Sequence, residues 1–328
     1  MNARPRLAAI CVVVVAGAAT GVVFAFSGST DAARPQARLR AHVLGACRST
    51  PRPVTGRPAR NTTIAFVRYA AGSYAIFLTS PRGGPARRLS ARPAGRPTVP
   101  RQNFQDEPSW SPNGRSIAFE SDRTGHAAFY VMRSDGTHTR RLSPGRPPDS
   151  TPSWSPDGTH IVFSRAERGL VLMRVDGSDA RALTHDLNTQ DLYPAWSPDG
   201  TRIAFVRREG GIGSALFLIR PDGTGLCELT PFSSNVTEPA WSPDGTRLAY
   251  SGGNGTGFGI HVVGANGRGR QALTPETLDF HPSWSPDGRL IAFVRDATLY
   301  VMNKDGTHVR RLTSANAIDG SPTWRPAV

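Results

Sequence analysis

One short phrase recurs along the chain at nearly constant spacing and constrains the fold more than any other feature. Pro-x-Trp-Ser-Pro-(Asp/Asn)-Gly occurs at 108–114, 152–158, 194–200, 239–245 and 282–288, and a sixth Pro-x-Trp ends at Trp324. The six Trp residues are separated by 44, 42, 45, 43 and 40 residues, which is the blade length of a β-propeller. A catalytic motif is needed once, whereas a repeated turn indicates a structural unit.

Each repeat predicts four short strands. A strand ending in Trp is followed by a Ser-Pro-Asp-Gly turn, in which Pro presets φ and Gly accepts a positive φ. A second apolar strand such as "IAF", a third such as "LVLM" at 170–173, an Asp-Gly or Asn-Gly hairpin and a fourth strand ending in Leu-Thr or Leu-Ser complete the unit. The content of 34 Gly and 28 Pro fits many turns.

The two ends of the repeat region complement each other. Residues 61–68, "NTTIAFVR", lack the preceding Pro-x-Trp strand, and residues 321–328, "SPTWRPAV", lack the following "IAF" strand. Pairing of the C-terminal strand with the N-terminal blade would close a ring and hide the edge strands. The chain is therefore predicted to be all-β, a six-bladed propeller of four-stranded antiparallel blades.

The repeat resembles the WD-like repeat of TolB-type six-bladed propellers, over residues 61–328. The resemblance implies the fold and says much less about function; TolB itself is a periplasmic protein of the Tol–Pal system. TolB carries an α/β domain before its propeller, and the residues that precede position 61 here leave no room for one. The chain is expected to be a propeller without that domain, so the role of TolB is not transferred to it.

The first sixty residues differ from the rest in charge and hydropathy. They hold nine Arg and one Asp, or +8 of the formal net charge of +14, so the repeat region has no basic stripe and no nucleic-acid partner is expected. Residues 7–26 are uncharged, which predicts a signal peptide or an N-terminal membrane anchor within residues 1–30. Residues 31–60 are rich in Arg, Pro and Ala and predict a flexible tether.

Three cysteines bear on the compartment. Cys11 lies in the apolar segment, Cys47 in the tether and Cys227 in the repeat region. Export would allow a Cys47–Cys227 disulfide, and two unrelated thiols are the alternative. "LGAC" at 44–47 resembles a lipoprotein cleavage box, but no apolar run lies directly upstream of it.

Acidic residues precede the Trp of every repeat. Asp149, Asp191, Asp279 and Asp319 lie five residues before their Trp, Asp106 lies four before, and Glu107 and Glu238 lie three before. With the Trp strand innermost, as the resemblance implies, these carboxylates would gather at the mouth of the central channel and bind a cation or a basic peptide. The alternative is that each Asp caps the crossover between blades through backbone N–H groups.

The position three before Trp varies in a way that the scaffold does not require. Its occupants are Glu107, Thr151, Tyr193, Glu238, His281 and Ser321. Tyr193, His281 and the two Glu would form a mixed polar lining for a ligand or peptide, and ordinary solvated loop residues are the alternative. His281 beside Asp279 provides too few ligands for a metal site, so no metal or cofactor is predicted.

The sequence contains no G-x-S-x-G, H-E-x-x-H, C-x-x-C or phosphate-binding loop motif. The prediction is therefore a non-catalytic, monomeric binding scaffold, exported or membrane-tethered through residues 7–26, with a protein or peptide partner in the cell envelope. A metal-assisted lyase or lactonase, centred on Asp191, Asp279 and His281, and a small-molecule sensor remain as alternatives.

Overall fold

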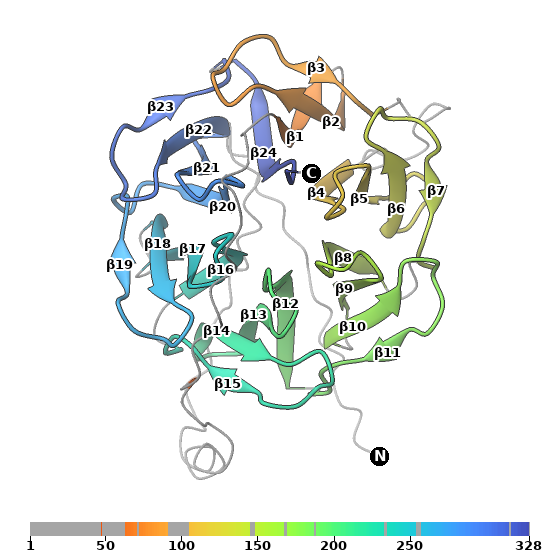
Figure 1. The fold of residues 1–328 in the computed structure, drawn as a ribbon, viewed down its shortest axis with the longest axis vertical. Coiled ribbons are helices and arrows are strands. Elements are labelled where there is room, and N and C mark those ends of the chain that lie inside the picture. The colour runs from red at the N-terminus through yellow and green to blue at the C-terminus, as the bar shows by residue number, and fades with distance from the viewer. Residues whose placement is uncertain are drawn as a thin grey trace, which may run out of the picture.

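The computed structural model describes residues 47, 63–70, 72–90, 105–144, 148–166, 169–186, 188–232, 235–253, 257–314 and 316–327. These residues form six four-stranded antiparallel sheets arranged as blades around a central axis (Figure 1). The all-β six-bladed fold predicted from the repeat is confirmed. The segments predicted as signal or anchor, 1–30, and as tether, 31–60, lie outside the described residues except for Cys47.

Each blade runs from an inner strand at the axis to a short outer strand at the rim (Figure 1). The inner strands, for blades 1 to 6, are β24 (Ile318–Trp324), β4 (Gln105–Trp110), β8 (Asp149–Trp154), β12 (Thr189–Trp196), β16 (Asn235–Trp241) and β20 (Asp279–Trp284). The second strands are β1 (Ile64–Ala70), β5 (Ser116–Ser121), β9 (His160–Arg165), β13 (Ile203–Glu209), β17 (Arg247–Gly253) and β21 (Leu290–Arg295).

The third strands are buried and apolar, and the fourth are two residues long. The third strands are β2 (Ser73–Thr79), β6 (Ala128–Arg133), β10 (Gly169–Arg174), β14 (Gly213–Ile219), β18 (Gly259–Gly264) and β22 (Thr298–Asn303). The outer strands are β3 (Arg87–Arg88), β7 (Arg140–Arg141), β11 (Arg181–Ala182), β15 (Cys227–Glu228), β19 (Gln271–Ala272) and β23 (Arg310–Arg311). The outer strands are short and five of the six carry a charged residue, which protects the rim against edge-to-edge pairing.

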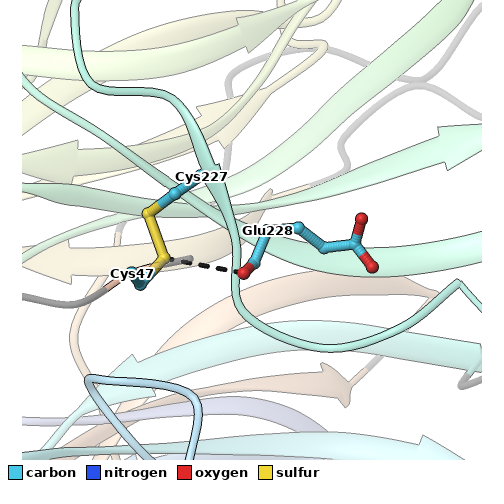
Figure 2. The surroundings of a disulfide bond; sticks show 3 residues. All are labelled: Cys47, Cys227 and Glu228. Atoms are coloured by element: carbon cyan, nitrogen blue, oxygen red, sulfur yellow. Dashed lines mark hydrogen bonds between the residues drawn. A yellow bond between two sulfur atoms is a disulfide. The ribbon is translucent and has the colours of Figure 1, made fainter. Parts of the chain in front are cut away.

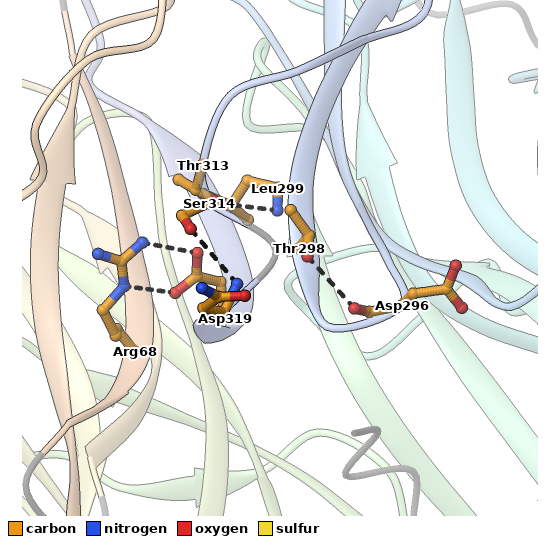
Figure 3. Close-up of polar contacts among 8 residues, drawn as sticks. Arg68, Asp296, Thr298, Leu299, Thr313, Ser314 and Asp319 are labelled. Atoms are coloured by element: carbon orange, nitrogen blue, oxygen red, sulfur yellow. Dashed lines mark hydrogen bonds and ion pairs between the residues drawn. The ribbon is translucent and has the colours of Figure 1, made fainter. Parts of the chain in front are cut away.

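Ring closure occurs as predicted. β24 pairs with β1, with Ile64 opposite Trp324 and Arg68 opposite Asp319. The Arg68 guanidinium donates two hydrogen bonds, of 2.6 and 2.8 Å, to the Asp319 carboxylate across this joint (Figure 3). The first blade is therefore assembled from both ends of the repeat region.

The repeated turns are held by their own side chains. In the turn after Trp154, Ser155 Oγ donates to Asp157 Oδ1 at 2.5 Å, and the backbone N–H of Thr159 donates to the same oxygen at 3.0 Å. Gly158 takes a φ of 72°, where residues with a Cβ are disfavoured. The recurrence of Ser, Asp and Gly is thus explained by local hydrogen bonding.

The hydrophobic core lies between neighbouring blades. Phe66 of blade 1, for example, packs in one cluster with Leu299 of blade 6. The indole N–H of Trp241 donates to the carbonyl of Ala195, on the inner strand of the preceding blade, at 3.0 Å. A Cβ at Gly306 would lie only 2.6 Å from Leu273 O of the preceding blade, so this Asp-Gly turn requires glycine for packing as well as for its φ of 87°.

A disulfide joins Cys47 to Cys227 on the outer strand of blade 4 (Figure 2). Both residues are buried in the cluster between blades 4 and 5. Within the described ranges no helix has the length and hydropathy needed to span a bilayer.

Candidate functional site

The six inner strands share a bulge three residues before the Trp. The strand pairing shifts register there in every blade, between Asp106 and Ser109 in β4 for instance. The residue at the bulge always has a positive φ: Glu107 (48°), Thr151 (55°), Tyr193 (54°), Glu238 (55°), His281 (53°) and Ser321 (45°). Non-glycine residues seldom adopt this conformation, and they concentrate at functional sites.

The six bulge residues surround one cavity on the propeller axis, with a volume of about 210 Å3. The Pro after each of them and the residue after that Pro complete its wall, so every blade contributes equally. The repeated backbone thus builds a ring, and the side chains at the bulge give that ring its chemistry.

Two glutamates from opposite sides of the ring meet a histidine in this cavity. Glu107 belongs to blade 2 and Glu238 to blade 5, which face each other across the axis (Figure 1). His281 Nδ1 lies 3.3 Å from Glu238 Oε1 and 3.9 Å from Glu107 Oε1. The backbone N–H of His281 also donates to Glu238 Oε2 at 2.7 Å, and Ser251 Oγ donates to the same oxygen at 3.1 Å. Glu238 is therefore fixed, with its side chain 13% exposed.

The carboxyl groups of blade 2 form the acidic side of the cavity. Burial, reinforced by the charges of Asp106 and Glu238, raises the pKa of Glu107 well above its ordinary value. Burial also raises the pKa of Asp106, opposed by a 2.7 Å hydrogen bond from Ser321 Oγ. On the neighbouring strand β5, burial and the nearby Asp106 raise the pKa of Glu120 to about 8. The carboxyl groups on this side of the ring therefore lose their protons at a higher pH than ordinary carboxyl groups do.

Tyr193 supplies the aromatic part of the lining. Burial, together with the negative charges of Glu238 and Glu107, raises the pKa of its phenol, which stays protonated and able to donate a hydrogen bond. Thr151, from blade 3, shares a 3.0 Å hydrogen bond with Ser164 behind it. The cavity therefore combines hydrogen-bond donors with two carboxyl groups.

The nine residues predicted for the channel mouth separate into two groups. Glu107, Tyr193, Glu238 and His281 line the cavity, with Asp106 directly before Glu107 in the chain. Asp149, Asp191, Asp279 and Asp319 are buried and paired with an Arg on the second strand of the same blade. Their partners are Arg165, Arg207, Arg295 and Arg68, each with two hydrogen bonds of 2.6–3.1 Å. Among the described residues, these carboxylates accept their hydrogen bonds from the Arg side chains, and Asp279 accepts one more, of 3.2 Å, from Thr277 Oγ1.

Sequence reasoning did not identify Glu120 or the Arg partners, although a signal for both is present. Four repeats combine Asp five residues before Trp with Arg on the second strand, whereas blade 2 has Gln105 and Ser121 there and blade 5 has Val236 and Gly252. Glu occupies the bulge only in these two blades. Glu120 stands where the other second strands have Ser or Val.

A metal centre has no obvious ligand set in the part of the chain that the structure describes, since no three His, Cys, Asp or Glu side chains are grouped to hold an ion.

Comparison with solved structures supports the fold. TolB from Acinetobacter baumannii superimposes with a TM-score of 0.65 at 20% identity, covering 81% of this chain and 67% of that one. A putative TolB from Agrobacterium tumefaciens gives 0.60 at 17% identity, covering 81% and 98%. An oligogalacturonate lyase from Vibrio parahaemolyticus gives 0.53 at 13% identity, covering 78% and 75%. At these identities the likeness extends to the fold.

The sequence itself gives the family. No curated protein matched the chain in a sequence search. The family model described as the TolB beta propeller domain matches residues 57–243 and 186–298, which together span more than half of the chain. The chain therefore belongs to the TolB β-propeller domain family.

Proposed function

We propose that this protein is a non-catalytic binding scaffold of the cell envelope, and that its central cavity receives a cationic group from a protein or peptide partner. The observation that carries the proposal is the bulge ring, in which an identical backbone presents six mostly different side chains to one cavity. The stability of the fold does not require Glu107, Glu238 and His281 at the bulge, because other blades have Thr or Ser at the same position.

The charges in the cavity favour a cation. Glu238 and Glu107 approach from opposite blades, so a lysine, arginine or amino-terminal group on the axis would lie between two carboxylates. A bound cation favours the ionised form of Glu107 and lowers its raised pKa. Binding should therefore release a proton and strengthen as the pH rises.

The size of the cavity supports a single chain end or side chain as the occupant. About 210 Å3 is smaller than the roughly 300–1,000 Å3 of pockets that enclose small organic ligands. The rest of the partner would then contact the face of the propeller around the cavity.

The envelope location rests on two features. The family includes the TolB propeller, and a disulfide between Cys47 and Cys227 is characteristic of oxidising compartments. We infer that residues 1–30 direct export, and that residues 31–60 link them to the propeller. Whether the chain is anchored or released would be read from the mass of its mature N-terminus.

Photo-cross-linking in the native host tests the proposal. A benzoylphenylalanine at Tyr193 would stand in the cavity wall, and the same group at Val309, which is 40% exposed on a turn before β23, serves as the control. We expect a discrete adduct from position 193, absent from position 309 and lost with Glu107→Gln/Glu238→Gln. Identical adducts from both positions, or an adduct that survives the double substitution, would contradict the proposal.

An enzyme is the second candidate, favoured by one observation. Glu107, whose pKa is raised, lies 3.9 Å from His281, and such pairs often act in general acid–base catalysis; one similar structure is a lyase. If the cavity is catalytic, turnover of some acidic oligosaccharide should be lost in Glu107→Gln and His281→Asn. If the wild type shows no such activity and a cross-linked partner is found, the binding scaffold remains the proposed function.

A further inference from the structure

A second cavity, of about 640 Å3, lies between blades 4 and 5, apart from the axial one. Blade 4 supplies the start of β12 and the hairpin that joins β13 to β14, and blade 5 supplies the start of β16 and Phe258. The inner strands of blades 4 and 5 extend further at this end than those of blades 3 and 6. β12 begins seven residues before its Trp and β16 begins six before, whereas β8 and β20 begin five before.

The walls of this interblade cleft are joined rigidly. Ser214 Oγ of blade 4 accepts a 2.8 Å hydrogen bond from the backbone N–H of Val236 and donates one of 2.9 Å to its carbonyl. A Cβ at Gly213 would lie 2.7 Å from Phe232 O, so the hairpin can pack here only with glycine. A cleft with fixed walls is a preorganised site, and its volume falls within the range of small-ligand pockets.

The lining is polar but close to neutral. Arg208 and Glu209 carry opposite charges, and the other polar side chains are amides and hydroxyls, including Asn188, Gln190 and Asn235. An amide places a donor beside an acceptor, which matches a pair of neighbouring hydroxyl groups. Phe258 and Ile212, which is 39% exposed, add an apolar surface on which the C–H face of a sugar ring would pack.

We propose that the interblade cleft binds a neutral saccharide the size of a mono- or disaccharide. The amides of Asn188, Gln190 and Asn235 would bond to its hydroxyl groups, and Phe258 would pack against a ring face. The site is separate from the axial cavity, so the proposal does not depend on the partner proposed above.

Calorimetric titration of the full chain with maltose, cellobiose and N,N′-diacetylchitobiose tests this. We expect at least one of them to bind with a Kd of about 1 mM or lower, and Gln190→Ala to weaken that binding about tenfold or more. Gln190 is exposed, so its substitution should leave the fold intact. Gln271→Ala, at an exposed glutamine on β19 outside the cleft, is the matched control and should leave the Kd unchanged.

Phe258→Leu offers a second variant, which keeps an apolar contact with Phe280 but removes the ring face. Phe258→Leu should weaken binding of the same saccharide by about tenfold, whereas Glu107→Gln in the axial cavity should leave the Kd of that saccharide unchanged. Failure of all three saccharides to bind would overturn the proposal, as would an unchanged Kd in Gln190→Ala.

Discussion

Blades 3 and 5 have the same strand arrangement but carry their acidic residues at different positions. Blade 3 buries Asp149 against Arg165, within the sheet and away from the cavity. Blade 5 has Val236 and Gly252 at those places and carries its acid at the bulge, as Glu238, facing His281. Blade 2, opposite blade 5, does the same with Gln105, Ser121 and Glu107.

The difference shows that carboxylates near the axis serve two purposes. Four are neutralised by a forked Arg that also lies over an aromatic ring, as Arg165 lies 5.0 Å from the centre of Phe163. These pairs hold the inner strand to the second strand. Within the described part of the chain, the two acids at the bulge have no Arg partner of this kind, and both line the cavity.

Breaking one scaffold pair should have the largest effect. Arg165→Ser leaves Asp149 buried without its partner, which should lower the free energy of unfolding by about 3–5 kcal/mol, measured by urea denaturation. The control is Asp149→Gln/Arg165→Ser, which reproduces the residues of blade 2 and should recover much of the loss. A double variant as unstable as the single one would show that the pair contributes more than mutual neutralisation.

Removing the disulfide tests a feature found in blade 4 alone among the described parts of the blades. Cys227 occupies the outer-strand place that Arg181 holds in blade 3. Cys227→Ser should lower the free energy of unfolding by about 2–4 kcal/mol, because the bond closes a loop of 180 residues. Dithiothreitol should destabilise the wild type equally and leave the variant unchanged. Equal stability of variant and wild type would mean that the bond does not form in solution.

The acidic side of blade 2 should make stability depend on pH. Between pH 4.5 and about 8 the folded protein retains the Glu120 proton that the unfolded chain has lost, so stability falls as the pH rises. The slope from this group is at most about 1.4 kcal/mol per pH unit. Glu120→Gln should flatten the decline between pH 5 and 8 in urea denaturation, with little change at pH 4. If the free energy of unfolding depended on pH in the variant as it does in the wild type, a group other than Glu120 would retain the proton.

The smallest effect is expected at an exposed arginine. Arg140 at the rim donates a 2.9 Å hydrogen bond to Val175 O of the next blade, but it lies in solvent. Arg140→Ala should therefore change the free energy of unfolding by less than about 1 kcal/mol. A loss comparable to that of Arg165→Ser would contradict the distinction between buried pairs and surface contacts.

The fold could be predicted from the sequence because each blade repeats its determinants. Trp, Ser-Pro-Asp-Gly and the closing strand at Trp324 are local signals, and six copies remove their ambiguity. The positions of Glu107, Tyr193, Glu238 and His281 in the cavity were predicted from the repeat alignment together with the family resemblance, which implied that the Trp strand is innermost. The Asp149–Arg165 type of pair required the register between inner and second strands, and the interblade cleft required the packing of two blades, which no repeat pattern encodes.

The central claim is that the bulge acids bind the partner whereas the paired acids support the fold. The most direct measurement is the cross-link from position 193, compared in the Glu107→Gln/Glu238→Gln and Asp149→Gln/Arg165→Ser backgrounds. The account predicts that the first background loses the adduct while the protein stays folded, and that the second keeps the adduct despite lower stability. An adduct that persists without the two glutamates and disappears without the buried pair would contradict it.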